Sequence, residues 1–327
     1  PDGKISLYGE KIFINTGSEP VIPPITGLQL SKRVYTSTTL MELSTLPQRL
    51  FIIGGGYIGL EFAAMYANYG SMVTVLEYGN TFIPREDRDI ANVIQTRLEE
   101  LGVRFIFNAQ VDEITDENEL TTVSYLERSS GMSVKIPADA VLVATGRKAS
   151  TASLNLEAAG VAVNERGEII VNELLQTTVP HIWALGDVKG GLQFTYISLD
   201  DFRIIKEQLF GQNDRTTANR PPVAYSVFLD PTFARVGLSE AEALLSGHKI
   251  KVAKIAEAAS PRARLFGSTS GYLKAIVAAF FCSEASEIIN IVQLAMKADL
   301  DYTVLRDNIY THPSMSEFLN DLFSTLD

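Results

Sequence analysis

A glycine-rich loop between a strand and a helix constrains the fold of this chain more than any other feature. The segment LFIIGGGYIGLEFA places Gly54, Gly56 and Gly59 directly after an apolar strand and at the start of a helix. Gly54 permits the tight turn, Gly56 lets a pyrophosphate approach the backbone, and Gly59 lets the helix pack closely on the strand. The N–H groups and positive dipole end of the helix favour phosphates. The loop therefore predicts a dinucleotide-binding unit.

An acidic residue, Glu77, ends the next predicted strand. A carboxylate there can accept hydrogen bonds from an adenosine ribose 2′-OH, and its charge repels a 2′-phosphate. Tyr78, Gly79 and Asn80 follow, without a nearby lysine or arginine. We therefore predict NADH rather than NADPH. The alternative, an unrelated glycine turn with a solvated Glu77, is weaker because strand, glycines, helix and acid occur together.

Strand and helix patterns alternate over much of the chain. Apolar strands are predicted at 49–53, 72–76, 103–107 and 140–143, and helices at 58–69 and 89–101. This alternation is typical of a doubly wound α/β domain, with antiparallel strands expected over 108–138. After about residue 219 proline-punctuated strands are followed by helices near 284–297 and from about 316, which indicates a separate α+β domain.

A second nucleotide signal lies in VPHIWALGDVKGGLQFTYIS. The predicted strand 182–185 ends at Gly186–Asp187, and a helix is expected from about Thr195. A carboxylate at a strand end beside glycines can hold a ribose or ribityl hydroxyl. Taken alone, an ordinary Gly-Asp turn explains the segment equally well.

Charge and cysteine content exclude several function classes. The 327 residues carry a net charge of −11, which argues against nucleic acid or an anionic membrane surface as a partner. The single cysteine, Cys282, lies in an apolar run and excludes an internal disulfide or CxxC pair. We interpret Cys282 as a buried core residue, and His181 and His248 as residues without a catalytic role. No transmembrane helix is expected, and a cytoplasmic location is predicted.

Five segments, in this order and spacing, resemble the class I pyridine nucleotide-disulfide oxidoreductases. This is the family of glutathione reductase, lipoamide dehydrogenase and mercuric reductase. The segments are the Thr16–Gly17 turn, GGGYIGLEFA, VLVATGRKAS, IWALGDVKGGLQFTYIS and THPSMSEFLNDLF. The resemblance extends over essentially the whole chain. It is strongest to the mercuric-reductase-like branch that includes flavoproteins of reactive chlorine resistance.

The resemblance implies two Rossmann-like, three-layer nucleotide-binding domains, the FAD part incomplete, and a C-terminal α+β dimerisation domain. The implied bounds are 1–35 and 147–218 for FAD, 36–146 for NAD(P), and 219–327 for dimerisation. The implied NAD residues are Gly54, Gly56, Gly59, Glu61, Glu77, Val111 and Gly146. The implied FAD residues are Thr16, Gly17, Arg147, Asp187, Phe194 and Thr195. No metal site is expected. By its residue type alone, Glu61 fits an ordinary helical glutamate as well as a functional one.

A histidine near the C-terminus has two interpretations. His312 precedes a proline, and the residue pattern alone favours an ordinary loop position. The resemblance implies a catalytic pair instead, in which His312 exchanges a proton with the redox thiol of the partner subunit and Glu317 orients the imidazole. That role requires a homodimer. Ser316 is expected to cap the last helix.

The resemblance implies an FAD-dependent NAD(P)H oxidoreductase that passes electrons from NADH through flavin to a dithiol, then to a disulfide, metal ion or small oxidant. The first FAD glycine motif, the CxxxxC pair and the lysine near the flavin are not among the 327 residues. In the family they precede the segment that starts this chain. Two alternatives therefore stay open. One is a dithiol-independent NADH oxidase or flavin reductase, and the other a non-catalytic nucleotide-binding fragment.

The segment 275–282 departs from the family in another way. Two antiparallel strands are implied here, but the run is apolar and contains no turn residue. We therefore hypothesise that a hairpin is missing between Val277 and Ala278.

Overall fold

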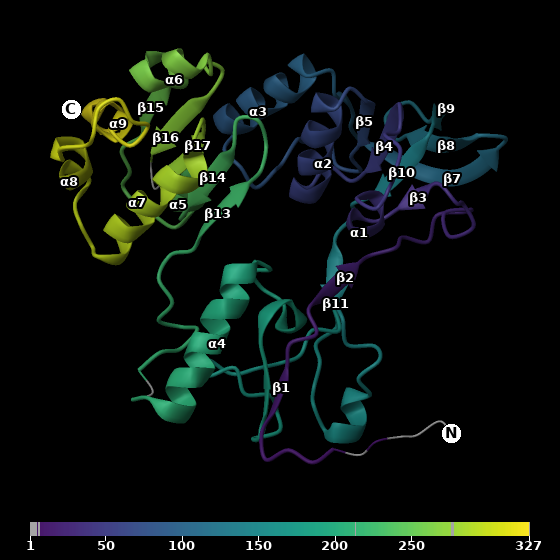
Figure 1. Cartoon of the computed structure of the whole chain (residues 1–327), viewed down its shortest axis with the longest axis horizontal. Helices are drawn as coiled ribbons and strands as arrows, with labels where there is room; N and C mark the ends of the chain where they lie inside the picture. The colour runs from purple at the N-terminus through teal and green to yellow at the C-terminus, as the bar shows by residue number, and fades with distance from the viewer. Residues whose placement is uncertain (1–4, 6, 213, 276–277, 327) are drawn as a thin grey trace. The chain divides into compact units, whose positions relative to one another are not determined.

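The computed structural model describes residues 5, 7–212, 214–275 and 278–326 (Figure 1). The chain forms two compact units. The first unit combines Pro1–Val21 with Gly146–Pro221, and the second combines Ile22–Thr145 with Pro222–Asp327. The predicted α/β class is confirmed. None of the described helices is long and apolar enough to cross a membrane.

A parallel sheet forms the centre of the second unit, with strand order β3-β10-β4-β5-β6. Its strands are β3 (Val34–Tyr35), β4 (Arg49–Ile53), β5 (Met72–Leu76), β6 (Arg104–Ile106) and β10 (Ala140–Val143). All neighbouring pairs are parallel. The predictions for β4, β5 and β10 are confirmed, and β6 is one residue shorter at each end than predicted. β3 joins this sheet, whereas the sequence-based bounds put it in the preceding domain.

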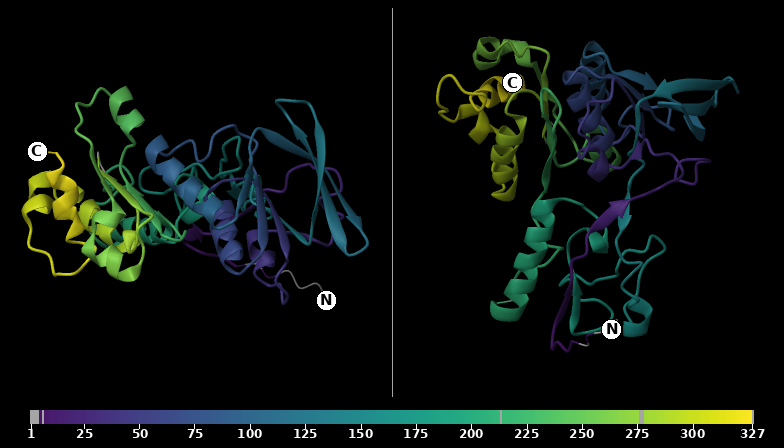
Figure 2. Two further views of the ribbon diagram at one scale, coloured as in Figure 1. Left: turned by 90° about the horizontal axis from the view of Figure 1, so that it is seen from above. Right: turned by 45° about the vertical axis from the view of Figure 1, so that its right-hand side comes forward.

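The two faces of this sheet are covered differently. Helices α1 (Ser37–Leu40), α2 (Tyr57–Asn68) and α3 (Arg88–Glu100) supply the helical side. The other side carries an antiparallel sheet of β7 (Ala109–Glu117), β8 (Leu120–Glu127) and β9 (Ser133–Ala138), as predicted for 108–138. The left view of Figure 2 shows the three layers in turn: blue helices, central strands and teal antiparallel strands.

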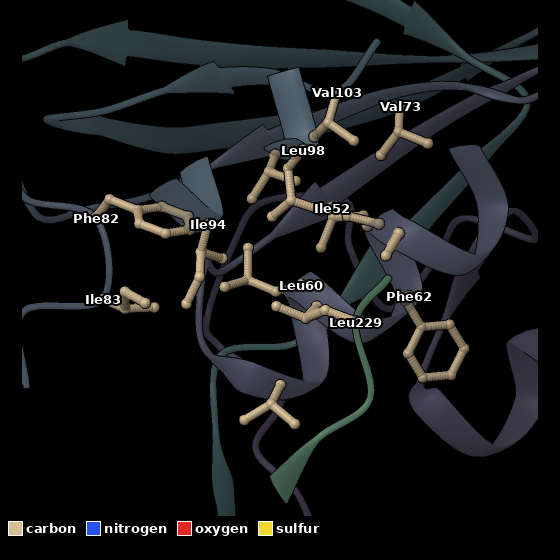
Figure 3. Packing of buried hydrophobic residues seen from close by; sticks show 14 of the residues in the cluster. Ile52, Leu60, Phe62, Val73, Phe82, Ile83, Ile94, Leu98, Val103 and Leu229 are labelled. Atoms are coloured by element: carbon tan, nitrogen blue, oxygen red, sulfur yellow. The ribbon is translucent and has the colours of Figure 1, made fainter. Parts of the chain in front are cut away.

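Strand alternation explains why β4 is apolar throughout. Successive side chains in a strand point to opposite faces. Leu50 and Ile52 pack with Leu60 and Ile94 of the helices, as Figure 3 shows for Ile52, Leu60 and Ile94. Phe51 and Ile53, on the opposite face of the strand, pack instead against the antiparallel sheet. A strand that is buried on both faces has a continuous run of hydrophobic residues.

The C-terminal part of the second unit is built on an antiparallel sheet of order β13-β14-β17-β16-β15. The strands are β13 (Ala224–Val227), β14 (Phe233–Val236), β15 (Ala253–Ala256), β16 (Tyr272–Ala275) and β17 (Ala278–Phe281). The helices are α5 (Glu240–Leu245), α6 (Pro261–Phe266), α7 (Ala285–Lys297), α8 (Tyr302–Asp307) and α9 (Phe318–Ser324), with a 3₁₀ turn η3 (Glu257–Ala259). β16 and β17 pair antiparallel, as the resemblance implied. The hypothesis of a missing hairpin concerns the junction between Val277 and Ala278, and it stays untested because Val277 lies outside the described residues.

One hydrophobic core joins the parallel sheet to this C-terminal sheet. Phe280 faces α7 and α9, where it packs with Ile288 and Leu319. Phe281 and Phe233 belong instead to the cluster that contains the helices of the parallel sheet, and α3 packs on β16 and β17. The second unit therefore has a continuous apolar interior across two different sheets.

The first unit is smaller. Its strands are β1 (Ile12–Ile14) paired parallel to β12 (Ile182–Ala184), and β2 (Ser18–Pro20) paired antiparallel to β11 (Arg147–Ala149). Its helices are α4 (Thr195–Phe210) and the 3₁₀ turns η1 (Leu156–Ala159) and η2 (Gly186–Lys189). Trp183 and Leu185 pack on Ile204 and Ile205 of α4. The helix expected from Thr195 is confirmed.

Candidate functional site

The glycine loop connects β4 to α2 and leaves an open backbone surface. Gly54 has φ +107°, and a side chain there would approach Ala144 O to 2.5 Å. A Cβ at Gly59 would come within 2.2 Å of Gly54 O, so close packing requires glycine at both positions. Gly56 differs, because no heavy atom lies within 4 Å of the Cβ position. As the N-cap of α2 it has no side chain to bond the first N–H groups, which suits a bound phosphate.

Glu77 is held at this loop by backbone N–H groups. Gly55 N–H donates to Glu77 Oε2 and Gly79 N–H donates to Glu77 Oε1, each at 2.8 Å. A residue directly after β5 is thus fixed against the loop after β4, because the two strands are neighbours in the parallel sheet. The glycines and the carboxylate predicted for a dinucleotide come together, and this geometry fits the ribose and phosphate groups of a dinucleotide.

Arg128 joins the same region and was missed by the sequence analysis. Its guanidinium carbon lies 4.2 Å from the centroid of the Tyr78 ring. Its Nη1 donates long hydrogen bonds of 3.4 Å to Tyr78 O and to Asn108 Oδ1. Arg128 directly follows β8, 50 residues after Tyr78, so no local sequence signal could have found it.

Glu61 lies within α2 and contacts the C-terminal part of the unit. Phe228 N–H donates to Glu61 Oε1 at 2.9 Å. Burial raises the pKa of Glu61, and the Phe228 hydrogen bond partly offsets this effect. Val111, also predicted for the dinucleotide site, lies on β7. The residue is 5% exposed and packs in the core between the parallel sheet and β7–β9.

A buried carboxylate ties the start of α2 to the C-terminal sheet. Tyr57, the residue after Gly56, donates its hydroxyl to Glu86 Oε1, and Tyr225 donates to the same oxygen at 2.7 Å. Arg235 Nη1 donates to Glu86 Oε2 at 3.1 Å. Burial and the Glu86 charge raise the pKa of Tyr57 well above its ordinary value, so its hydroxyl stays protonated at neutral pH.

In the first unit, Ser18 connects two of the predicted FAD residues. Ser18 Oγ donates to Asp187 Oδ2 at 2.7 Å, and Arg147 Nε donates to Ser18 Oγ at 2.7 Å. Arg147 Nη2 also donates to Ser18 O at 2.6 Å. Asp187 Oδ1 has no hydrogen-bond partner within the described part of the chain, so it can accept from a ligand hydroxyl. The sequence analysis did not identify Ser18.

The other predicted FAD residues lie on the turns around this cluster. Thr16 donates its hydroxyl to Ser150 O at 2.8 Å, and Gly17 has φ +72° with no atom near its Cβ position. Phe194 is the N-cap of α4, and Thr195 is its first residue. The open space at Gly17 fits the close approach of a flavin cofactor. Gly146, predicted for NAD, belongs to this first unit.

His312 and Glu317 form a close pair. His312 Nδ1 lies 2.8 Å from Glu317 Oε2 and 3.0 Å from Oε1. The His312 side chain is 72% exposed, whereas that of Glu317 is 17% exposed. The expected cap at Ser316 is wrong. Glu317 is itself the N-cap residue of α9, and its N–H donates to Ser314 Oγ at 3.2 Å.

The environments of Cys282, His181 and His248 agree with the interpretation of these three residues as non-catalytic. Cys282 is fully buried in the core of the C-terminal part, and burial raises the pKa of its thiol well above the ordinary value. A neutral buried thiol is a poor nucleophile. His181 and His248 are both exposed.

Comparison with known families shows to which family this chain belongs. The family model described as pyridine nucleotide-disulphide oxidoreductase matches residues 2–201, and the dimerisation domain of the same family matches residues 223–323. The chain belongs to the pyridine nucleotide-disulphide oxidoreductase family.

Individual members of the family are similar over nearly the whole chain. The probable pyridine nucleotide-disulfide oxidoreductase RclA of Escherichia coli is 51% identical over 334 residues, which cover 99% of this chain and 74% of RclA. A mercuric reductase of Staphylococcus aureus is 34% identical and is matched over 61% of its length. The structure of the Cu(II) complex of RclA, described as an HOCl-induced flavoprotein disulfide reductase, superposes with a TM-score of 0.94 at 50% identity. The superposition covers 98% of this chain and 75% of the RclA chain.

These comparisons confirm the predicted family, the α/β fold and the assignment as an oxidoreductase enzyme. They also confirm the predicted similarity to the reactive-chlorine-resistance branch. The family consists of FAD-dependent pyridine nucleotide oxidoreductases, and the C-terminal part of this chain is its dimerisation domain.

Proposed function

We propose that the protein oxidises NADH and passes the electrons, by way of FAD and a redox dithiol, to a disulfide, a metal ion or a small oxidant. The observation that carries this proposal is Glu77 held against an open glycine loop, in a chain of the disulfide oxidoreductase family. The Cu(II) complex of RclA supports including metal ions among the acceptors. We also propose that the protein works in the cytoplasm.

The dinucleotide residues have separate roles in this proposal. The backbone at Gly56 and the start of α2 receive the pyrophosphate, and Gly54 and Gly59 shape the loop. Glu77 accepts from the ribose 2′-OH and repels a 2′-phosphate, which favours NADH. Glu61 and Val111 complete the proposed dinucleotide set within the second unit.

The FAD residues lie in the first unit in this proposal. Bound flavin supplies the acceptor for the hydride of NADH. Asp187 Oδ1 accepts from a cofactor hydroxyl while Ser18 holds the other carboxylate oxygen. Arg147 fixes Ser18, and the turn at Thr16 and Gly17 allows close approach. Phe194 and Thr195, at the start of α4, complete the proposed FAD residues.

His312 and Glu317 form the proposed proton-transfer pair. Glu317 accepts from Nδ1–H, which leaves Nε2 of the exposed imidazole to take up or release a proton. The dimerisation-domain match supports a homodimer, in which His312 serves the partner subunit's dithiol, a pair that members of the family carry ahead of the segment that starts this chain.

A pair of histidine variants tests this assignment. In His312→Ala we expect acceptor-dependent turnover to fall by about 100-fold or more, because one general acid–base group is lost. The rate at which NADH reduces the bound flavin, measured by stopped-flow absorbance, should stay unchanged because this step does not involve the pair.

His248→Ala is the matched control, since it removes an exposed histidine far along the chain from the pair, and it should leave both rates unchanged. The role fails if His312→Ala slows flavin reduction as much as turnover, or changes neither. Unchanged turnover in His312→Ala would favour a dithiol-independent oxidase.

A further inference from the structure

Arg128 brings a positive charge to the residue that follows Glu77. Its guanidinium stacks 4.2 Å from the Tyr78 ring centroid, and Tyr78 is joined directly to Glu77. The backbone supports this approach. Arg128 N–H donates to Asn108 O at 3.0 Å, and Asn108 N–H donates to Gly79 O at 2.8 Å. The end of β8 is therefore tied to the turn that carries the acidic residue.

The guanidinium of Arg128 has spare hydrogen-bonding capacity. Among the described residues, no carboxylate lies within ion-pair distance of it, and its side-chain hydrogen bonds to neutral oxygens are both 3.4 Å long. An arginine carries five N–H donors and stays charged at all physiological pH values. Ring stacking keeps the group in place while its donors remain available to an anion.

We propose that Arg128 is a second specificity determinant of the dinucleotide site and binds the 2′-phosphate of NADPH. The inference rests on the proposed function of the Glu77 loop as that site. An acidic residue and a nearby arginine are the alternative devices for reading the ribose 2′ position. This chain has both, one from β5 and one from β8. The difference in affinity between NADH and NADPH is therefore small, because Arg128 offsets the repulsion between Glu77 and the 2′-phosphate.

The proposal concerns the 2′-phosphate alone, so paired ligands separate it from general binding. We would measure the Kd of NADH and NADPH by fluorescence, and the competition of 2′,5′-ADP and 5′-ADP, for the wild type and Arg128→Gln. The variant should bind NADPH and 2′,5′-ADP about tenfold more weakly, the effect of losing one charge-assisted contact. The Kd of NADH and 5′-ADP should change less than about twofold, since neither carries the 2′-phosphate.

Two further variants sharpen the test. Arg128→Lys keeps the charge but not the planar donors, and should recover part of the NADPH affinity. Lys135→Gln is the matched control, because it removes one positive charge from β9 of the same antiparallel sheet, opposite Ser124. It should change neither affinity.

The outcomes distinguish the inference from the function on which it depends. Equal weakening of both dinucleotides in Arg128→Gln, or no change in either, would overturn the role of Arg128. If the wild type binds neither dinucleotide, the proposed function of the loop itself fails.

Discussion

Gly54 and Gly56 lie two residues apart in one loop and are glycine for different reasons. Gly54 combines φ +107° with the backbone of Ala144 at 2.5 Å from any added Cβ. Gly56 has φ −74° and no atom within 4 Å of the Cβ position. The fold therefore requires glycine at the first position, whereas at the second position the proposed approach of a pyrophosphate explains it.

This difference leads to a paired prediction. Gly54→Ala should destabilise the protein by about 2 kcal/mol or more, because a strained φ and a backbone clash coincide. Gly56→Ala should leave the thermal unfolding temperature almost unchanged, yet weaken NADH binding by about tenfold or more, because the methyl group occupies the approach of the pyrophosphate. Calorimetry and NADH titration of both variants check this. A Gly56→Ala protein that binds NADH normally would contradict the role of the loop.

At the residue scale, the sequence revealed those functional residues whose spacing is local. Glu77 follows the glycine loop by one helix and one strand, and the structure holds it against that loop. Arg128 and Ser18 gave no such signal. Arg128 reaches Tyr78 only because β7 and β8 form a sheet over the parallel strands. Ser18 contacts Asp187 across 169 residues of sequence.

Among the elements, β16 carries a buried lysine that holds two helix starts together. Lys274 is 2% exposed, and its Nζ lies 3.0 Å from Asp87 Oδ2, 2.9 Å from Asp89 Oδ1 and 2.8 Å from Glu240 Oε2. Asp87 is the N-cap of α3 and Glu240 is the first residue of α5. Burial alone would lower the pKa of Lys274, but the carboxylates outweigh it and raise the pKa to about 12.

Removing this cation should destabilise the second unit. We expect Lys274→Met to lower the free energy of unfolding by about 3–5 kcal/mol at neutral pH, because three carboxylates lose their shared counter-charge. The pKa in the folded state is higher than the ordinary value of about 10.4, so the stabilisation is complete below pH ~10.4 and is lost as pH rises towards ~12. Denaturant titrations across alkaline pH should show the two proteins converging.

Lys206→Met, which removes an exposed lysine from α4, is the control and should change the unfolding free energy little at any pH. A difference between wild type and Lys274→Met that persists unchanged above pH ~12 would contradict the ionic explanation.

Elements were predictable where a single period dominates. The buried strands β4, β5 and β10 and the helices α2, α3 and α7 appear within one residue of expectation, because apolar runs and amphipathic stripes mark them. The start of α9 was not. Ser316 has the residue type of a cap, but Ser314 accepts the N–H bond that a cap would take. Such details depend on the path of the turn, which residue types alone do not determine.

For the whole molecule, the sequence identified the parts but not how their cores join. The change in pattern near residue 219 suggested a separate C-terminal domain. In the structure Phe233 and Phe281 of that part share a core with Ile94 of α3, and Leu229 packs there as well (Figure 3). The hydrophobic periodicity of the sequence does not reveal this contact, because each side chain lies on the ordinary buried face of its own element. The domain bounds proposed from the sequence are continuous segments, whereas each compact unit groups residues that contact one another, so Ile22–Thr145 and the C-terminal part form one unit.

The transfer of electrons from NADH to bound flavin is the central claim of this account, and an anaerobic titration of the purified flavin-bearing protein tests it most directly. NADH should remove the visible absorption band of the oxidised flavin in proportion to the amount added, and Gly56→Ala should need far more NADH for the same change. A band that dithionite bleaches but NADH leaves unchanged would contradict the account.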